Sequence, residues 1–528
     1  MTDFRVLTRS LGESPLARLA LDGDAPGGWY GALPRGADGW RTRVEQVRLE
    51  FAGRDWLGAL GDAFDASGAA AERLARVAAG GGIVVTTGQQ PGLFGGPIYT
   101  WSKALSALAL ANGLEQATGV PVAPVFWAAT YDADFAEASV THVALGSQVK
   151  RLQMDPPAVP GREMRDTPLG DVSQLASVLE RAAGSAADPA VIEMVLAAYS
   201  RDATVGSAFV VLLRHLLEPL GIAVLDAGHP AVHAAEGPLL MEALRKADVV
   251  DDELRSRERD MRVLGHDPQV AHVDGLSLVF AESNGERVRI PIAEAAVAAR
   301  DGTRVDLEPN VLLRPVAERA IVPTAAYVAG PGELAYFAQA SAVAAALGAP
   351  ELLAVPRWSG MIVEPHVQRI LERHGLAIDD LQAAHAALGR LARERLSDRV
   401  RAALAGYREA LDRAAEELSS ALTAAGEPDV PDAVLSGARN SIGHRLDRLE
   451  RRILAASKRH HEALTRDVET ARASLFPLGR PQERVLNLMP MLARHGEPLL
   501  LAMLARASEH ASALIAAGAM YAGRETGS

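Results

Sequence analysis

The chain has 528 residues, of which 48% are hydrophobic and 23% are charged, so its size and composition predict a globular protein of two to four domains. Its formal net charge of −12 argues against a general nucleic-acid-binding protein, which needs a basic surface to neutralise phosphates, but permits a local basic pocket. The absence of cysteine excludes disulfides, thiolate metal sites and a cysteine nucleophile.

No segment has the pattern of a signal peptide or of a membrane helix. The first 19 residues contain Asp3 and Glu13 and have no apolar core. The apolar stretch at residues 498–517 is interrupted by Arg506, Glu509 and His510, and no uninterrupted run reaches the roughly 20 residues that span a membrane. We therefore expect a cytoplasmic protein with no membrane or nucleic-acid partner.

The first part of the chain alternates predicted strands with predicted helices. Helical spacing occurs at residues 100–114 and 207–217, and short apolar runs predict strands at 82–87, 120–127, 222–226 and 352–356. This alternation predicts an α/β core with a parallel sheet, in which ligands bind beyond the carboxyl ends of the strands. We assign residues 1–365 to this core. Residues 260–315, which contain the turn signal Asn284-Gly285, are a predicted small β-rich insertion.

Residues 366–473 have a different pattern, typical of an antiparallel coiled-coil hairpin. One apolar stripe runs through Val400, Leu404, Tyr407, Leu411, Ala414, Leu418 and Ala421, and another through Ile442, Leu446, Leu449, Ile453, Ala456, His460 and Ala463. The breaker at residues 426–431 separates them. An arm of about 45 residues would reach roughly 65–70 Å. An ordinary helical bundle is the alternative. The helical residues 474–528 are expected to return to the core.

A glycine-rich turn joins the strand at 82–87 to the following helix. Its four glycines at positions 88, 92, 95 and 96 permit close backbone approaches, and a strand-to-helix turn of this kind directs N–H groups at an anion. Lys103, in the helix, would add a positive charge. The alternative is a tight structural turn. The segment is not a Walker A loop, because no Gly-Lys-Ser/Thr follows.

Two further segments carry candidate functional groups. Asp132 and Asp134 follow the strand that ends near Trp127, and they are suited to hold magnesium or an amine, to transfer protons, or only to cap a helix. Glu333, after a Gly-Pro-Gly turn, is suited to bind an amine or to complement a helix dipole. Arg314 is suited to pair with a carboxylate or phosphate, or to form a surface salt bridge. The sequence assigns no metal ligands.

Taken together, these segments resemble the cysteine-adding enzymes of bacillithiol biosynthesis. The matches lie in family order between about residues 80 and 485. They include TGQQPGLF at 87–94, GPIYT at 96–100, PVFW at 124–127, Arg314-Pro315, GPGELAY at 330–336, Pro356-Arg357, LFP at 475–477 and PQER at 481–484. The resemblance implies a Rossmann-like core with inserted segments. It also implies a coiled coil that forms a homodimer, and an ATP-dependent ligase that joins the carboxyl group of cysteine to the amine of glucosaminyl malate. The family commonly has Glu-Asp-His-Asp where this chain has Tyr131-Asp132-Ala133-Asp134.

We therefore expect the following roles. Gly88, Gln89, Gln90, Gly92, Gly96 and Lys103 would bind the nucleotide; Asp132, Asp134 and Glu333 would be catalytic; and Trp127, Arg314 and Tyr336 would bind substrate. ATP is the expected co-substrate, and Mg²⁺ is a candidate cofactor. Two alternatives remain: a related ligase for another amino acid or amine, and a nucleotide-binding scaffold without catalysis.

Overall fold

The computed structural model describes residues 4–12, 14–185, 187–283, 286–300, 307–425, 431–460 and 462–517. The predicted turn Asn284-Gly285 and residues 426–430 of the predicted breaker lie outside this set. The chain forms two compact units. The first comprises residues up to 143, residues 150–362 and the segment from 482; the second comprises residues 144–149 and 363–481.

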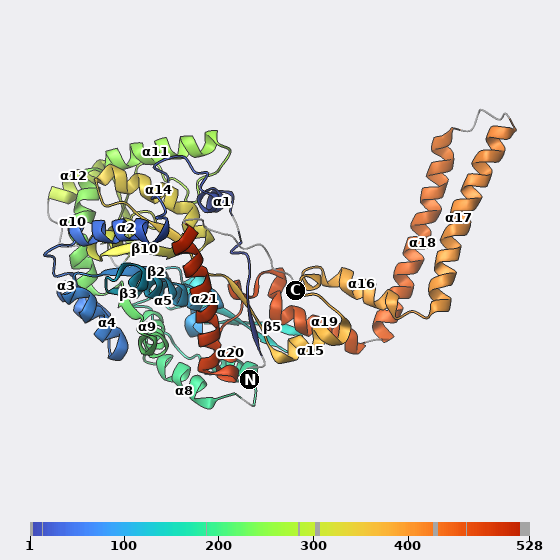
Figure 1. Cartoon of the computed structure of the whole chain (residues 1–528), viewed down its shortest axis with the longest axis horizontal. Coiled ribbons are helices and arrows are strands. Elements are labelled where there is room, and N and C mark those ends of the chain that lie inside the picture. Colours follow the sequence, from blue (N-terminus) through green and yellow to red (C-terminus); the bar gives the residue numbers. More distant parts are fainter. Residues whose placement is uncertain are drawn as a thin grey trace. The chain divides into compact units, whose positions relative to one another are not determined.

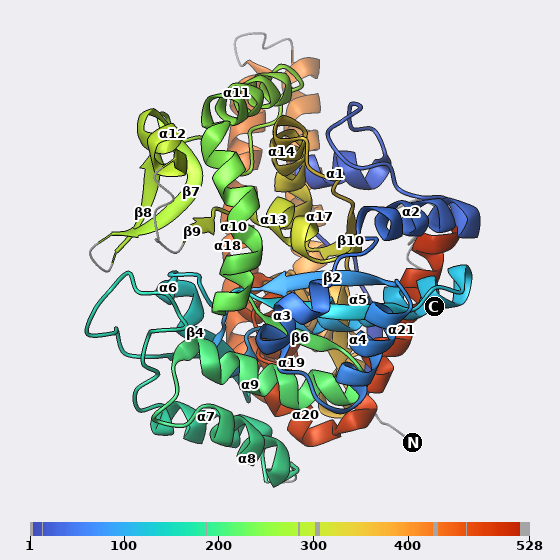
Figure 2. The same cartoon turned by 90° about the vertical axis from the view of Figure 1, so that its left-hand side faces the viewer.

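The first unit is built on a five-stranded parallel sheet with strand order β11-β10-β2-β3-β6 (Figure 2). The strands are β2 (Ile83–Gln89), β3 (Val122–Ala128), β6 (Ala223–Asp226), β10 (Thr324–Ala329) and β11 (Ala354–Pro356). The four predicted strands are thus confirmed with shifted ends, and β10 is a strand that the sequence analysis missed. From β2 the chain proceeds to β3 and β6 on one side, and it places β10 and β11 on the other. The topological switch point therefore lies between β2 and β10.

The strand β3 tolerates a proline although it lies between two neighbours. Pro124 is opposite Val85 of β2, whereas pairing with β6 begins one residue later, at Val125 and Ala223. Pro124 therefore lies in the part of β3 that pairs with β2 alone. Its missing N–H removes no hydrogen bond between β3 and β6.

Helices surround the sheet and connect its strands. Helix α5 packs on β2, β3 and β10, and α3, α4 and α9 pack on β6 at the edge (Figure 2). The helices of this unit are α1 (Pro15–Asp22), α2 (Gly36–Glu50), α3 (Trp56–Phe64), α4 (Gly68–Ala79), α5 (Ile98–Thr118), α6 (Phe135–Ala138), α7 (Ser173–Ala183), α8 (Pro189–Ala198), α9 (Val205–Leu217), α10 (Pro230–Arg245), α11 (Ala247–Val263), α12 (Ile292–Arg300), α13 (Arg314–Ile321), α14 (Pro331–Leu347), α20 (Met489–His495) and α21 (Glu497–Ala517). Three short 3-10 turns are η1 (Leu93–Gly95), η2 (Glu218–Leu220) and η5 (Gln482–Arg484). The remaining strands outside the main sheet and the insertion are β1 (Arg5–Thr8), β4 (Val140–Leu145), β5 (Gln148–Gln153) and β12 (Gly360–Val363).

Among the described helices, α21 is the one whose length and composition would allow it to cross a membrane. It is amphipathic, however, with Leu499, Met503, Ala507 and Leu514 buried at helical spacing. It packs along α5, and the Nε2 atom of His510 lies 3.0 Å from the carbonyl oxygen of Pro356. The apolar face of α21 is therefore used inside the fold.

The predicted β-rich insertion is confirmed as a three-stranded antiparallel sheet with order β8-β7-β9. Its strands are β7 (Leu276–Ser283), β8 (Glu286–Pro291) and β9 (Leu307–Pro309), and α12 lies between β8 and β9. Val270 and Val273, two apolar residues within the predicted insertion, precede its first strand.

The second unit contains the predicted hairpin. It consists of α15 (Pro365–His374), η3 (Ile378–Leu381), α16 (Ala384–Glu394), α17 (Asp398–Ala424), α18 (Asp432–His460), α19 (Glu462–Leu475) and η4 (Pro477–Gly479). Helices α17 and α18 lie side by side (Figure 1), and ion pairs fix their antiparallel register: Arg408 contacts Asp447 at 2.7 Å, and Arg439 contacts Asp412 at 2.7 Å.

The predicted length of the hairpin was wrong. Helix α17 has 27 residues and α18 has 29, which correspond to about 40 Å rather than the expected 65–70 Å. The shortening has local causes. Gly375 ends α15 in the left-handed conformation, with φ 58°, and the Ser397 hydroxyl accepts a hydrogen bond from the Val400 N–H at the start of α17.

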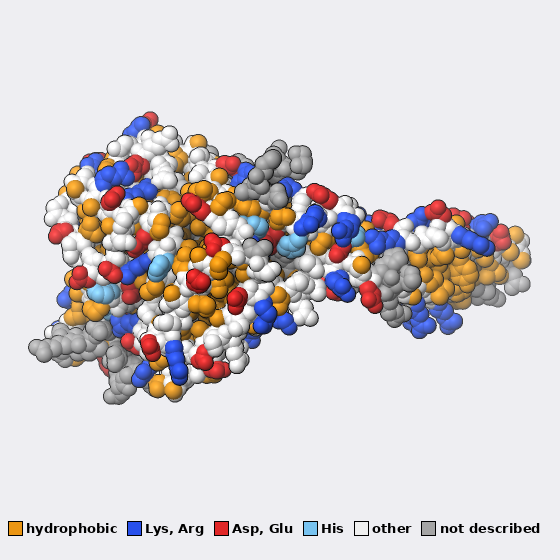
Figure 3. All heavy atoms as spheres, turned by 90° about the horizontal axis from the view of Figure 1, so that it is seen from below, with side chains coloured by type: hydrophobic (Ala, Val, Ile, Leu, Met, Phe, Trp, Pro, Cys, Tyr) orange, Lys and Arg blue, Asp and Glu red, His pale blue; other side chains and the backbone are white. Residues whose placement is uncertain are grey.

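The predicted apolar stripes are only partly covered within one chain. Leu446 is buried and Leu404 and Leu411 are half-buried, as expected for the contact between α17 and α18. Tyr407 and Leu449, however, remain 60% and 49% exposed, and Val400, Leu418 and Ile442 are also exposed. Figure 3 shows hydrophobic side chains gathered over the hairpin. The apolar stripe is thus wider than one partner helix can cover.

Candidate functional site

A cavity of about 530 Å³ lies at the carboxyl ends of the central strands, beside the switch point. Strands β2, β3, β10 and β11 contribute the residues at or just after their ends, and the inserted β-sheet contributes another wall. Its polar and aromatic lining includes Gln89, Gln90, Tyr99, Lys103, Trp127, Tyr131, Asp132, Phe280, Arg287, Arg289, Asn310, Arg314, Tyr327, Glu333, Tyr336, Arg357 and Arg484. The sheet topology thus brings together residues separated by almost 400 positions.

The structure places most of the predicted site residues in this cavity. Those that line it are Gly88, Gln89, Gln90, Lys103, Trp127, Asp132, Arg314, Glu333 and Tyr336. Gly92 and Gly96 instead line a second cavity of about 440 Å³, which also contains Gln89 and Gln90. Asp134 lines neither cavity. The glycine-rich turn therefore forms a wall between two cavities.

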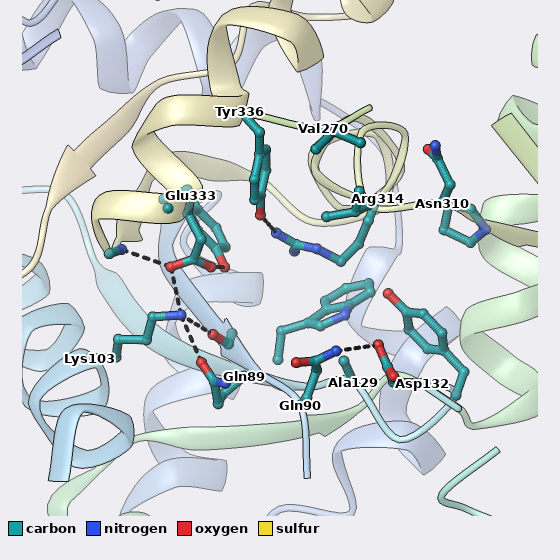
Figure 4. A pocket seen from close by; sticks show the side chains of 18 of the residues that line it. Gln89, Gln90, Lys103, Ala129, Asp132, Val270, Asn310, Arg314, Glu333 and Tyr336 are labelled. Atoms are coloured by element: carbon teal, nitrogen blue, oxygen red, sulfur yellow. Dashed lines mark hydrogen bonds and ion pairs between the residues drawn. The ribbon is translucent and has the colours of Figure 1, made fainter. Parts of the chain in front are cut away.

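Lys103 and Glu333 form the charged centre of the main cavity (Figure 4). Helix α5 brings Lys103 from the β2 side and α14 brings Glu333 from the β10 side, and the Nζ and Oε2 atoms lie 2.6 Å apart. The ammonium group also donates to the carbonyl oxygen of Gly88 at 2.6 Å and to Gln89 Oε1 at 3.1 Å. This pair therefore bridges the two halves of the sheet at the switch point.

Burial and charge pairing act in opposite directions on these two groups. Burial of Lys103, which is 4% exposed, lowers its pKa more than the carboxylate of Glu333 raises it. For Glu333, burial raises the pKa, but Lys103 and hydrogen bonds from the Gly330 N–H and the Tyr327 hydroxyl outweigh burial and lower it overall. Glu333 is therefore a carboxylate at neutral pH.

Arg314 is held rigidly in the first turn of α13. Its Nη1 donates to Glu318 Oε2 at 2.9 Å, its Nη2 donates to the Tyr336 hydroxyl at 3.1 Å, and its Cζ lies 5.0 Å from the centroid of the Tyr327 ring (Figure 4). The side chain is buried, so it is not the surface salt bridge that the sequence left open. It presents a fixed planar cation to the cavity.

The glycine-rich turn is fastened by side chains from elsewhere. Asn487 Nδ2 donates to the carbonyl oxygens of Phe94 at 2.9 Å and of Gly96 at 3.1 Å. The N–H of Gly95 donates to the Tyr199 hydroxyl, and the N–H of Gly96 donates to the Leu93 carbonyl. These two N–H groups already have hydrogen-bond acceptors within the protein. An anion bound at this turn would therefore be held mainly by side chains. Gly88 has a separate role: a Cβ atom there would lie 3.0 Å from the Trp127 carbonyl oxygen.

The two aspartates after β3 have different positions. Asp132 Oδ2 accepts a hydrogen bond from Gln90 Nε2 at 2.5 Å, and its side chain reaches the cavity (Figure 4). The Asp134 carboxylate is exposed and accepts the Glu137 N–H at 3.0 Å, which caps α6. The structure therefore gives Asp134 the capping position that the sequence left as an alternative.

Several cavity residues were not predicted. Six basic side chains line the cavity against only two acidic ones, in a chain of net charge −12. Arg357 and Arg484 lie in segments that carry the family resemblance, but they had no assigned role. Arg357 is 1% exposed and forms a bidentate pair with Glu483 at 2.8 and 2.6 Å. Arg287 and Arg289 could have been found from their alternation just after the predicted turn Asn284-Gly285, because residues two apart on a strand lie on one face. Among the residues that the structure describes, no three acidic or histidine side chains group as a metal site.

Comparison with protein families gives the same two-part division. Residues 39–357 match the N-terminal Rossmann-like domain of bacillithiol biosynthesis BshC, and residues 360–513 match its C-terminal coiled-coil domain. The chain belongs to the BshC family. Its core is therefore a Rossmann-like domain, and its second unit contains the family's coiled coil. All predicted site residues lie within the Rossmann-like match, which ends at Arg357.

Named relatives support this membership. A protein of Solibacter usitatus is 33% identical over 80% of this chain and 82% of its own length, and one of Koribacter versatilis is 30% identical over 81% and 82%. A protein of Bacillus licheniformis is 26% identical over 79% and 81%. Each of the three carries the name "Putative cysteine ligase BshC".

Proposed function

We propose that this protein is a cysteine ligase of bacillithiol biosynthesis, which joins the carboxyl group of cysteine to the amine of glucosaminyl malate at the expense of ATP. Family membership supports the ligase chemistry. The observation that carries the proposal for this chain is the cavity at the switch point, where six basic side chains surround two carboxylates. Such a cavity suits anionic substrates that also present an amine.

Amide formation needs an activated carboxyl group, because a free carboxylate is a poor electrophile at neutral pH. An oxygen of the cysteine carboxylate attacks a phosphorus atom of ATP, and either pyrophosphate or ADP leaves. The acceptor amine then attacks the activated carbonyl carbon, and AMP or phosphate leaves as the amide bond forms. The amine must lose a proton in this step. Asp132, which reaches the cavity, accepts a hydrogen bond from the amine, orients it and takes the proton as the general base.

The remaining residues bind and position the substrates. The side chains of Gln89 and Gln90 line both cavities, so the nucleotide lies across the wall between them. Lys103 has its three donors engaged by Glu333, Gly88 and Gln89, so it positions this wall and supplies positive charge. Arg314, Tyr336 and Trp127 bind the substrates. Magnesium would enter bound to the ATP phosphates, because no preformed acidic cluster exists among the described residues.

The proposal includes a homodimer formed by the coiled coil and a cytoplasmic location. The exposed apolar side chains of Tyr407 and Leu449, together with those of Val400, Leu418 and Ile442, support a second copy on this face of the hairpin. A ligase for another amino acid or amine is the second candidate, favoured by Tyr131 and Ala133 in place of the usual family residues.

The test is mass spectrometry of products after incubation of the purified protein with cysteine, glucosaminyl malate, ATP and magnesium. We expect a product whose mass equals the sum of the two substrates minus water, and AMP or ADP identifies the route of activation. A folded protein that hydrolyses no ATP and forms no product with this pair would refute the cysteine ligase proposal. Product formation with a different amine would establish the second candidate.

A further inference from the structure

The inserted β-sheet presents two neighbouring arginines to the main cavity. Arg287 and Arg289 are separated by one residue on β8, and both line the cavity. The Nε of Arg287 donates to Glu308 Oε2 at 2.7 Å, and its Cζ lies 3.8 Å from the centroid of the Phe280 ring. The Nε of Arg289 donates to the Ser277 carbonyl at 2.9 Å. Both guanidinium groups are therefore oriented by fixed contacts.

Arg289 differs from the other half-buried or buried bases of the cavity in its charge balance. Each of those bases has a carboxylate: Glu333 for Lys103, Glu318 for Arg314, Glu483 for Arg357 and Glu308 for Arg287. Among the side chains that the structure describes, no carboxylate lies within 4.0 Å of Arg289, although this residue is half-buried. Burial, followed by the proximity of Arg287, lowers its pKa. An anion at this position would therefore relieve an uncompensated charge.

We propose that Arg289, with Arg287 beside it, binds the two carboxylates of the malate part of the acceptor, so that the β7–β8 hairpin selects the acceptor substrate. The inference rests on the proposed function for the identity of the acceptor. The planar guanidinium group of Arg289 keeps Nη1 and Nη2 for bidentate contact with a carboxylate. A malate group has two carboxylates: Arg289 binds one through its planar fork, and the other lies beside Arg287, whose charge Glu308 partly offsets.

The insertion lies on the side of the cavity where acceptor recognition would be separate from the chemistry. Val270 and Asn310, which border the inserted sheet, lie on the opposite side of the cavity from Gln90 and Asp132 (Figure 4). A substrate whose malate end lies against the insertion therefore directs its other end, which carries the amine, toward Asp132 and the sheet. Recognition and chemistry are assigned to different structural elements, as is usual in enzymes with inserted segments on an α/β core.

The test compares Arg289→Gln with the control Arg300→Gln, an exposed arginine of the same insertion that lines neither cavity. In Arg289→Gln we expect the KM for glucosaminyl malate to rise on the order of 10- to 100-fold, with the KM for cysteine and for ATP unchanged. Arg289→Lys keeps the charge but not the planar fork, so its KM for glucosaminyl malate should lie between those of the wild type and Arg289→Gln. The dimethyl ester of glucosaminyl malate should be a poor substrate for the wild type and equally poor for Arg289→Gln. The Arg300→Gln control should match the wild type.

The outcomes separate this inference from the proposed function. Product formation with an acceptor KM in Arg289→Gln within about twofold of the wild type would overturn the role of Arg289 and leave the ligase proposal intact. If the wild type forms no product, isothermal titration with L-malate decides: binding to the wild type and the control that is lost in Arg289→Gln supports a dicarboxylate site. Equal binding of L-malate to all three proteins, or binding to none of them, overturns the proposed dicarboxylate site. Circular dichroism and thermal unfolding verify that each variant is folded.

Discussion

Replacing Lys103 with methionine leaves the carboxylate of Glu333 in the cavity wall without its counter-ion. Removing one partner of a buried ion pair costs about 3–5 kcal/mol of unfolding free energy, because the other charge remains buried. The Lys103 side chain is 5% exposed and that of Glu333 is 17% exposed, with 2.6 Å between Nζ and Oε2. Glu333 keeps its hydrogen bonds from Gly330 and Tyr327, so we expect a loss near the lower limit, about 3 kcal/mol.

The double variant Lys103→Met, Glu333→Gln distinguishes a structural role from a functional one. Removing both charges removes the uncompensated carboxylate, so we expect most of the lost stability to return, to within about 1 kcal/mol of the wild type. Urea unfolding followed by fluorescence of the six tryptophans and by circular dichroism measures this, provided that the two probes give coincident transitions. Turnover of the ligase reaction is measured on the same samples.

Three results would have different meanings. A loss below about 1 kcal/mol in Lys103→Met would refute the argument that the pair is tightly coupled. Recovery of stability without recovery of turnover would show that the charges act on the substrates. Recovery of both would show that the pair only joins α5 to α14.

Three further predictions follow from the same structure. Asp132→Asn should lower turnover by about 100-fold or more, whereas Asp134→Ala should lose only about 1 kcal/mol of capping energy and keep its turnover, as steady-state kinetics and urea unfolding will measure. Burial raises the pKa of Glu236 from its usual 4.5 to about 8, so the folded state keeps a proton that the unfolded state has lost, and stability falls as the pH rises through this window. Glu236→Gln should therefore raise the free energy of unfolding by about 3 kcal/mol at pH 7 and by almost nothing near pH 4, as urea unfolding at the two pH values will measure. An equal gain at pH 7 and pH 4 would contradict the raised pKa of Glu236. Glutamate at Tyr407 and Leu449 should give a monomer in analytical ultracentrifugation, where a persistent dimer would exclude this face as the interface.

The fold was predictable wherever a strand has a strong local signal. β2 and β3 are rich in Val, Ile or aromatic residues, and β6 is part of the apolar run Ile222 to Leu225, so their apolar runs indicated them directly. β10 was missed although it is fully buried beside the switch point, because three of its six residues are alanines. Alanine has a low strand preference, so this segment becomes a strand through pairing with β2 and β11 rather than through its own composition.

The hairpin shows which part of a helical pattern the sequence does not determine. Its existence and its two stripes were readable, and the signals at Gly375 and Ser397 that shorten it were present but not used. Leu404 and Tyr407 belong to the same predicted stripe, yet Leu404 is half-buried and Tyr407 is exposed. Periodicity identifies an apolar face, but it does not say whether the covering helix comes from the same chain or from a second copy.

The candidate site was predictable where function is concentrated in short motifs. The turn after β2, Asp132 and the start of α14 were identified locally, and the sheet topology then placed them around one cavity. The pairing of Lys103 with Glu333 and the arrival of Arg289 from the insertion depend on contacts between distant segments. No local pattern specifies such contacts, so the basic character of the cavity emerged only from the structure.

The geometry also ranks the two departures from the family motif. Ala133, which stands where the family commonly has histidine, does not line either cavity, so its change need not alter the chemistry. Tyr131, which replaces an acidic residue, lines the main cavity and is 6% exposed. Replacing an acid with a tyrosine removes a negative charge from a cavity that already has a basic excess, which further favours an anionic substrate. If substrate preference differs between this chain and its relatives, position 131 is therefore the first place where the cause should be sought.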